Sequence, residues 1–164
     1  MEPGTIYEEK ITSKWIVAIL ICATGSMLFL LGYQVLVAPI GTPTVLTWFY
    51  LIMFLLFLGL TFVFSRLIIK MTPSSISVGY GPLKYVILWQ NVEDCFLDET
   101  SELKYGGSGI RMTKVEGKSR IVYSIVGGPR VVLSLKEGRY KELAFSTRHP
   151  QEVMKVIKEW AHLE

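Results

Sequence analysis

Residues 15–37 read WIVAILICATGSMLFLLGYQVLV, and residues 46–65 read LTWFYLIMFLLFLGLTFVFS. Both runs lie in a window of 51 consecutive residues, between Lys14 and Arg66, that contains no Asp, Glu, Lys, Arg or His. At about 1.5 Å per residue, helices of these lengths match the hydrocarbon core of a bilayer, about 30 Å thick. Two prolines and a glycine in residues 38–44 favour a reversal between the runs. The window therefore predicts a transmembrane hairpin.

A cleaved signal peptide is the alternative interpretation of the first run. Its apolar stretch exceeds the usual core of roughly 7–15 residues, and Glu2, Glu8 and Glu9 precede it. Leu36 also stands where a cleavage site ending at Ala38 would need a small residue. We therefore interpret the run as a retained anchor.

The flanks of the two spans carry positive charges, and the loop between them carries none. Lys10 and Lys14 precede the first span, and Arg66 and Lys70 follow the second. Lys and Arg are enriched in the cytoplasmic loops of membrane proteins. The charges therefore predict a multi-pass protein of the cell membrane with both termini in the cytoplasm.

The rest of the chain has the composition of an ordinary domain. Of 164 residues 51% are hydrophobic, the net charge is +3, and every Asp, Glu, Lys and Arg lies outside the charge-free window. This composition excludes a fully soluble protein, a disordered one and a disulfide scaffold. We divide the chain into a cytoplasmic N-terminal segment (1–14), the hairpin (15–67) and a cytoplasmic domain (72–164). Residues 67–69 are expected to extend the second helix into a short linker.

After Lys70 the apolar residues follow a period of two, which is typical of half-buried strands. Val131, Leu133 and Leu135, for example, share one face of such a run. Gly-Pro and Glu-Gly pairs mark turns between the runs. The predicted strands are residues 75–80, 85–89, 92–99, 109–113, 119–125, 130–136 and 140–146. Seven short strands at this spacing suggest a small antiparallel barrel or sandwich.

The C-terminal segment has the pattern of a helix, which Pro150 is suited to begin. Val153, Val156, Ile157 and Trp160 recur at helical spacing and form one apolar stripe. We expect Trp160 to close one end of a barrel. The predicted fold class is α+β: a two-helix transmembrane hairpin, then a seven-stranded antiparallel β-barrel capped by a C-terminal amphipathic helix.

Five short segments give the chain a resemblance to a known family. They are Tyr7-Glu8-Glu9, Leu88-Trp89-Gln90-Asn91-Val92, Tyr105-Gly106-Gly107-Ser108-Gly109-Ile110-Arg111, Val126-Gly127-Gly128-Pro129-Arg130-Val131 and Thr147-Arg148-His149-Pro150-Gln151-Glu152. By the order and spacing of these segments, the chain resembles prokaryotic two-helix membrane proteins that carry a bacterial pleckstrin-homology (PH)-like domain. Ser108 departs from the pattern, which usually has an aromatic residue there. The resemblance implies a PH-like barrel at a membrane and implies no reaction.

No motif in the sequence indicates catalysis or metal binding. The glycines of residues 106–109 lack the Lys-Ser/Thr pair of a phosphate-binding loop, and we interpret them as turn residues. The two cysteines and two histidines are too dispersed for a zinc site. An acidic cluster without a neighbouring base is expected to be a solvated rim; its members are Glu93, Asp94, Asp98, Glu99 and Glu102. We therefore expect no enzyme, no cofactor and no metal.

The middle of the predicted domain is rich in cations: Lys104, Arg111, Lys114, Lys118, Arg120 and Arg130. Near an anionic lipid surface each cation contributes about 1 kcal/mol to binding. Lys114, Lys118 and Arg120 are therefore the candidate anionic-lipid contacts. The alternative is that strand alternation divides these residues between two faces, where they only solvate the hairpins. The first predicted β-hairpin offers only Lys84, which gives no support to specific phosphoinositide binding.

Together these features predict a non-enzymatic integral membrane protein. Its hairpin would anchor a PH-like domain for protein–protein or lipid-surface contacts, with the bilayer and a protein partner or a second copy of the chain as partners. A lipid or small-ligand sensor or accessory subunit, and a subunit of an oligomeric channel or transporter, are the alternatives. A nucleic-acid partner is not expected, because a net charge of +3 without interleaved aromatic and basic residues is not a nucleic-acid footprint.

Overall fold

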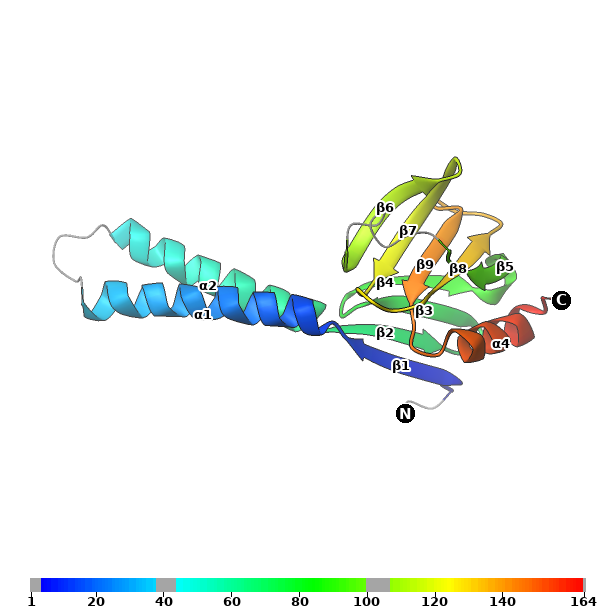
Figure 1. The fold of residues 1–164 in the computed structure, drawn as a ribbon, viewed down its shortest axis with the longest axis horizontal. Helices are drawn as coiled ribbons and strands as arrows, with labels where there is room; N and C mark the ends of the chain where they lie inside the picture. The colour runs from blue at the N-terminus through cyan, green and yellow to red at the C-terminus, as the bar shows by residue number, and fades with distance from the viewer. Residues whose placement is uncertain (1–3, 38–43, 100–106, 164) are drawn as a thin grey trace. The chain divides into compact units, whose positions relative to one another are not determined.

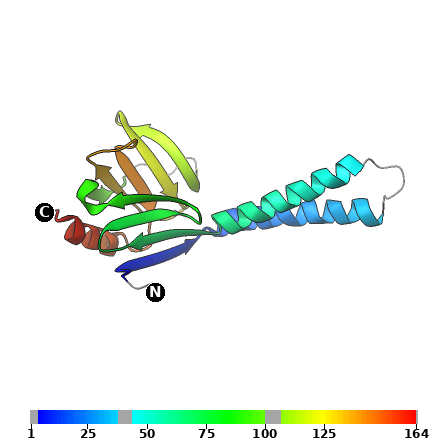
Figure 2. The same cartoon turned by 180° about the vertical axis from the view of Figure 1, so that it is seen from behind.

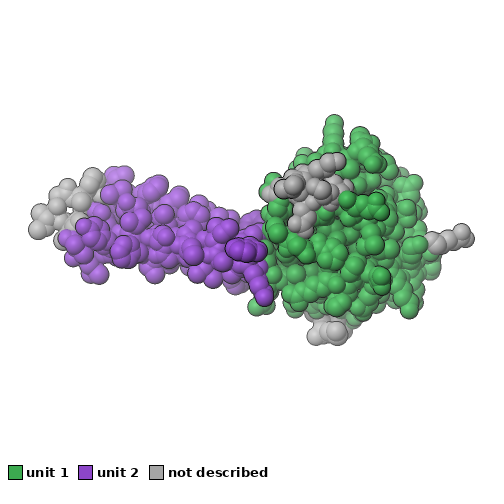
Figure 3. Space-filling view, viewed as in Figure 1, with its two compact units in different colours: residues 1–13, 66–164 green, residues 14–65 purple. Residues whose placement is uncertain are grey.

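The structure is a computed structural model that describes residues 4–37, 44–99 and 107–163. The chain divides into two compact units, which Figure 3 colours separately. One unit consists of residues 14–65, and the other combines residues 1–13 with residues 66–164. The second unit therefore contains both ends of the chain.

The helical unit consists of α1 (Lys14–Leu36) and α2 (Thr44–Phe64), which run side by side in opposite directions (Figure 1). Their bounds agree with the predicted spans to within two residues. Each is long and apolar enough to cross a membrane. Of the described residues in this unit only Gln34 is buried, so apolar side chains are exposed all around both helices. A helix that is apolar on every side needs an apolar surrounding.

The two helices meet through threonines. The hydroxyl oxygens of Thr24 and Thr61 lie 3.5 Å apart, and each also lies within hydrogen-bond distance of a carbonyl one turn earlier. The small residues Gly25, Gly32 and Gly59 would favour close helix approach, but a Cβ added at any of them would meet nothing within 4 Å. These glycines therefore do not bring the two helices together.

The described residues of the β unit form nine strands and one long helix. The strands are β1 (Tyr7–Thr12), β2 (Arg66–Met71), β3 (Ser75–Tyr80), β4 (Leu83–Leu88), β5 (Val92–Leu97), β6 (Gly109–Val115), β7 (Lys118–Ser124), β8 (Arg130–Leu135) and β9 (Glu142–Ser146). Sheet A has the order β1-β2-β3-β4, and sheet B has the order β5-β8-β9-β7-β6. The 3-10 turn η1 (Trp89–Asn91) leads from one sheet to the other.

The seven predicted strands are all present, as β3 to β9, and two further strands were missed. The stretch expected to extend the second span as a helix and linker is strand β2, in which every second residue is buried. The N-terminal segment is strand β1, which pairs with β2 over its whole length, from Tyr7 opposite Met71 to Thr12 opposite Arg66. Both strands belong to the same folded unit as residues 72–164.

The prediction of a closed, purely antiparallel barrel is wrong. The described strands form two open sheets that face each other (Figures 1 and 2). All pairs in sheet A are antiparallel, whereas sheet B contains one parallel pair, β7 with β9. The hydroxyl of Tyr80 on β3 donates to the carbonyl of Ser124 on β7 and links the two sheets. The coarser prediction of an α+β fold is confirmed.

The core lies between the sheets and beneath α4 (Pro150–Ala161), which lies against β5, β8 and η1. Leu67, Ile69 and Leu133 are among its fully buried side chains. On α4 the buried residues are Val153 and Ile157. Trp160 is only half-buried and borders an open hollow beside Trp89, so it does not close the end of a barrel.

Candidate functional site

The structure separates the three predicted lipid contacts. In the β6–β7 hairpin Lys114 lies opposite Ser119, whereas Lys118 lies opposite Val115 and Arg120 opposite Thr113. Because side chains alternate along a strand, Lys118 and Arg120 share one face of the sheet and Lys114 lies on the other. Lys114 and Lys118 are exposed, but Arg120 is only 5% exposed. The three residues do not form one cationic surface.

Arg120 belongs to a buried ion-pair network on sheet B. Its Nε and Nη2 lie 2.7 and 2.6 Å from Oε2 of Glu142, and its Nη1 lies 3.3 Å from Oδ1 of Asp98. Asp98 Oδ2 also accepts from Nε of Arg130 at 2.9 Å. Lys118 completes the network at its exposed edge, 3.6 Å from Glu142. The Arg120 charge is compensated within the fold by the carboxylates of Glu142 and Asp98.

Asp98 was expected in a solvated rim, and its side chain is instead 2% exposed. The surrounding acidic residues Glu93, Asp94 and Glu99 are exposed, as expected. Glu102 and Lys104 lie outside the described residues. The sequence pattern missed this network because its members come from three strands and an adjoining loop, and no local spacing relates them.

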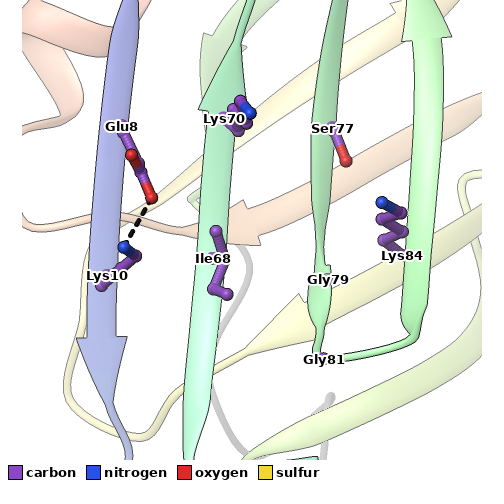
Figure 4. Close-up of a pocket in the computed structure, with 8 residues that line it drawn as sticks. All are labelled: Glu8, Lys10, Ile68, Lys70, Ser77, Gly79, Gly81 and Lys84. Atoms are coloured by element: carbon purple, nitrogen blue, oxygen red, sulfur yellow. Dashed lines mark ion pairs between the residues drawn. The ribbon is translucent and has the colours of Figure 1, made fainter. Parts of the chain in front are cut away.

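A second group of cations gathers on the outer face of sheet A. Alternation places Lys10 on β1, Lys70 on β2 and Lys84 on β4 on this face, with Glu8 among them. They surround a hollow of about 430 Å³ whose floor is formed by Ile68, Ser77, Gly79 and Gly81 (Figure 4). Three cations and one carboxylate give the hollow a net positive charge.

The register of sheet A brings these residues together in two rows. One row runs from Lys10 through Ile68 and Gly79 to Lys84, and the other begins with Glu8 opposite Lys70. Sequence reasoning missed the group because it treated β1 and β2 as tails of the membrane hairpin. Alternation within the hexapeptides YEEKIT and RLIIKM was the signal that could have found it.

Glu8 and Lys10 form the one ion pair inside this hollow that Figure 4 marks. Nζ of Lys10 lies 2.7 Å from Oε1 of Glu8. The hydrogen bond from Lys10 is the main cause that holds the pKa of Glu8 below its usual value, and the Lys10 and Lys70 charges add to it. Glu8 is therefore ionised at neutral pH.

Gly79 allows Lys84 to approach the middle of the sheet. A Cβ at position 79 would collide with the carbonyl oxygen of Leu83 and with Cα of Lys84. Only a residue without a side chain leaves room for β4 at this distance. The glycine therefore helps to place the Lys84 side chain over the hollow.

Several residues of the family-like segments form hydrogen bonds that hold the unit together. Ser108 Oγ accepts from the backbone nitrogen of Val126 at 2.8 Å. Asn91 donates to the carbonyl of Glu137 and accepts from its nitrogen, both at 2.8 Å. In the described part of the two glycine-rich segments, Gly107, Gly109 and Gly127 have positive φ, which is the turn role expected of them. These hydrogen bonds and turns stabilise the β unit.

The described residues offer little for redox or metal chemistry. No group of three or more His, Cys, Asp or Glu side chains among them is arranged to hold a metal ion. Cys95 is buried, and burial raises the pKa of its thiol to about 12, so the nucleophilic thiolate is disfavoured at neutral pH. The chemistry that the geometry supports best is electrostatic binding of an anion on sheet A.

Comparisons with protein-family models, with curated proteins and with solved structures found no match to this chain. A function therefore has to be argued from the residues themselves. The two features that can carry such an argument are the apolar helices and the sheet whose strands continue from them.

Proposed function

We propose that this chain is a non-enzymatic integral membrane protein of the cell membrane. Its helical hairpin anchors a PH-like domain at the cytoplasmic surface, where the domain contacts lipid headgroups or a protein partner. One observation carries the proposal: β1 and β2 are paired strands, β1 ends two residues before α1 begins, and β2 begins two residues after α2 ends. Only one residue therefore lies between each helix and the strand of the β unit next to it.

The direct connections limit how far the β unit can move from a membrane. Thr12 and Lys14 are separated by one residue, as are Phe64 and Arg66. A chain extends by at most about 3.6 Å per residue, so the first row of sheet A, Thr12 opposite Arg66, lies within about 8 Å of both helix ends. Basic residues on both connections and none in residues 38–43 favour the cytoplasmic side.

The topology can be tested by cysteine labelling of the full chain in intact cells. A cysteine replacing Thr42, which lies outside the described residues, should react with a membrane-impermeant maleimide from outside. A cysteine replacing Lys118, whose side chain is 59% exposed, should react only after permeabilisation. Extraction of the chain by alkaline carbonate, or the reverse labelling pattern, would refute the proposal.

The exposed edge of sheet A favours a protein partner as a second function of the same domain. β4 is the last strand of this sheet, and its Val86 and Leu88 are 54% and 57% exposed. A hollow of about 620 Å³ runs beside it, towards the turn between β8 and β9. Residues 85–88 of this edge carry no charge, and an exposed edge of this kind can take an added strand. Chemical crosslinks formed at this edge in native membranes should disappear on Val86→Lys and persist on Lys114→Gln.

A further inference from the structure

We propose that the outer face of sheet A binds the headgroup phosphate of anionic phospholipids through Lys10, Lys70 and Lys84. The inference rests on the proposed membrane anchoring and adds the binding face and the lipid class. It also moves the predicted lipid contact from the β6–β7 hairpin to residues that the sequence pattern assigned to the membrane flanks.

Charge complementarity is the first argument. The hollow on sheet A holds three ammonium groups and one carboxylate. Each lysine offers three N–H donors on a flexible stem, and the Ser77 hydroxyl on the floor is a further donor. A phosphate diester offers only acceptors and one negative charge. By contrast, the cations of the β7 hairpin are split between two faces, and Arg120 is already paired with two carboxylates.

Distance from the helices is the second argument. The row that joins Lys10 to Lys84 lies two residues along the strands from the row of Thr12 and Arg66. At about 3.4 Å per residue the two rows are about 7 Å apart. Charges interact through physiological salt over about 8 Å, and headgroups add about 5–7 Å to each side of the hydrocarbon core. Lysine side chains on this row can therefore reach headgroups beside the anchor.

The carboxylate of Glu8 competes with a lipid phosphate for Lys10. This carboxylate lies among the lysines and holds Lys10 at 2.7 Å. An arriving phosphate has to replace the carboxylate as the partner of Lys10. Neutralising Glu8 should therefore strengthen lipid binding, an effect that a purely solvating set of lysines would not produce.

The test uses the full chain in nanodiscs that contain phosphatidylcholine and phosphatidylglycerol. Both lipids carry a phosphate, but only phosphatidylglycerol has a net negative charge. A photo-crosslinking amino acid at Ser77, on the floor of the hollow, captures the lipid that occupies it, and mass spectrometry identifies the lipid class. We expect the fraction of adducts that contain phosphatidylglycerol to be several-fold higher than the fraction of phosphatidylglycerol among the lipids of the disc. The excess should disappear in ~1 M salt, where the Debye length falls to about 3 Å.

Variants separate this site from general surface charge. Lys10→Gln with Lys84→Gln should abolish the excess, whereas Glu8→Gln should increase it. The matched control, Lys114→Gln with Lys118→Gln, removes the same charge from exposed positions elsewhere and should leave the excess unchanged. All four lysines are exposed, so each variant is expected to fold, and an unchanged melting temperature checks this. Lys84→Glu alone reverses the charge of one lysine in the hollow, and the excess of phosphatidylglycerol adducts is measured for it in the same way.

Three results would overturn the inference. Adducts at the bulk lipid ratio would show that the face does not select charge. An excess that survives the Lys10 and Lys84 substitutions would place the selecting group elsewhere. Loss of lipid adducts on addition of inorganic phosphate at constant ionic strength would assign the site to a soluble anion. Failure of the membrane proposal itself is distinguishable, because the chain would then not reconstitute into discs.

Discussion

At the scale of single residues, the carboxylate of Glu9 joins the start of the β unit to its end. It accepts hydrogen bonds from the hydroxyl of Thr147 at 2.6 Å, from the backbone nitrogen of Arg148 at 2.8 Å and from the hydroxyl of Tyr7 at 3.1 Å. Burial is the main cause that raises the pKa of Tyr7, and the Glu9 charge adds to it. Glu9 thus fixes β1 to the segment that leads into α4. We expect Glu9→Ala to lower the free energy of unfolding by about 1–3 kcal/mol, because it leaves the donors without an acceptor. Glu8→Ala, one residue away on the opposite face, is the matched control and should cost much less in a denaturation experiment. Equal losses would mean that the contact with Thr147 and Arg148 contributes nothing.

The network around Arg120 gives a second prediction at this scale. Glu142→Gln should destabilise the fold by about 3–5 kcal/mol, because it leaves a buried guanidinium short of one carboxylate. Replacing both partners, with Arg120→Met and Glu142→Leu, should recover much of the loss, since Asp98 keeps Arg130 as a partner. The same denaturation curves measure both, and a double variant no better than Glu142→Gln would contradict the argument.

At the scale of elements, α4 contributes to stability through its middle and less through its end. Ile157 is fully buried, whereas Trp160 lies at the rim of an open hollow. We expect Ile157→Ala to cost about 2–5 kcal/mol and Trp160→Ala to cost less, although tryptophan is the larger side chain. Thermal and chemical denaturation of both variants would decide, and a larger loss for Trp160→Ala would show that the end of α4 is buried more deeply than described.

The helix and strands β3 to β9 could be predicted because each carries its own period and its own turn residues. Strands β1 and β2 were missed, because charged residues 8–10 and the apolar residues 67–69 look like the flanks of a membrane span. Alternation within each hexapeptide was the only local signal for them, and their pairing across 53 intervening residues is reported by no local pattern. The cationic hollow was missed for the same reason, since two of its three lysines lie on these strands.

At the scale of the whole molecule, the helical hairpin is an insertion between two paired strands. Thr12 and Arg66 are cross-strand partners, so a two-residue turn could connect β1 to β2 directly. We expect a chain of residues 4–12, Asn-Gly and residues 66–164 to be soluble and to unfold cooperatively. A fragment of residues 72–164 should not fold, because it lacks two strands of sheet A and the buried side chains of Leu67, Ile69 and Met71. Circular dichroism and amide exchange of the two proteins give the comparison, and a folded 72–164 fragment would show that β1 and β2 are dispensable.

The pairing of β1 with β2 also sets an order of events during translation. β1 leaves the ribosome first, and its partner follows only after 53 further residues, several seconds later at about 5–20 residues per second. Through that interval β1 has no neighbour strand from its own sheet. If the two helices cross a membrane as proposed, the ladder closes only when the second helix has returned β2 to the compartment that holds β1. A chain whose second helix stayed outside the lipid, or whose first strand was translocated, would leave an unpaired sheet edge for chaperones and proteases to find. Under the proposed topology, completion of sheet A therefore depends on correct insertion of both helices.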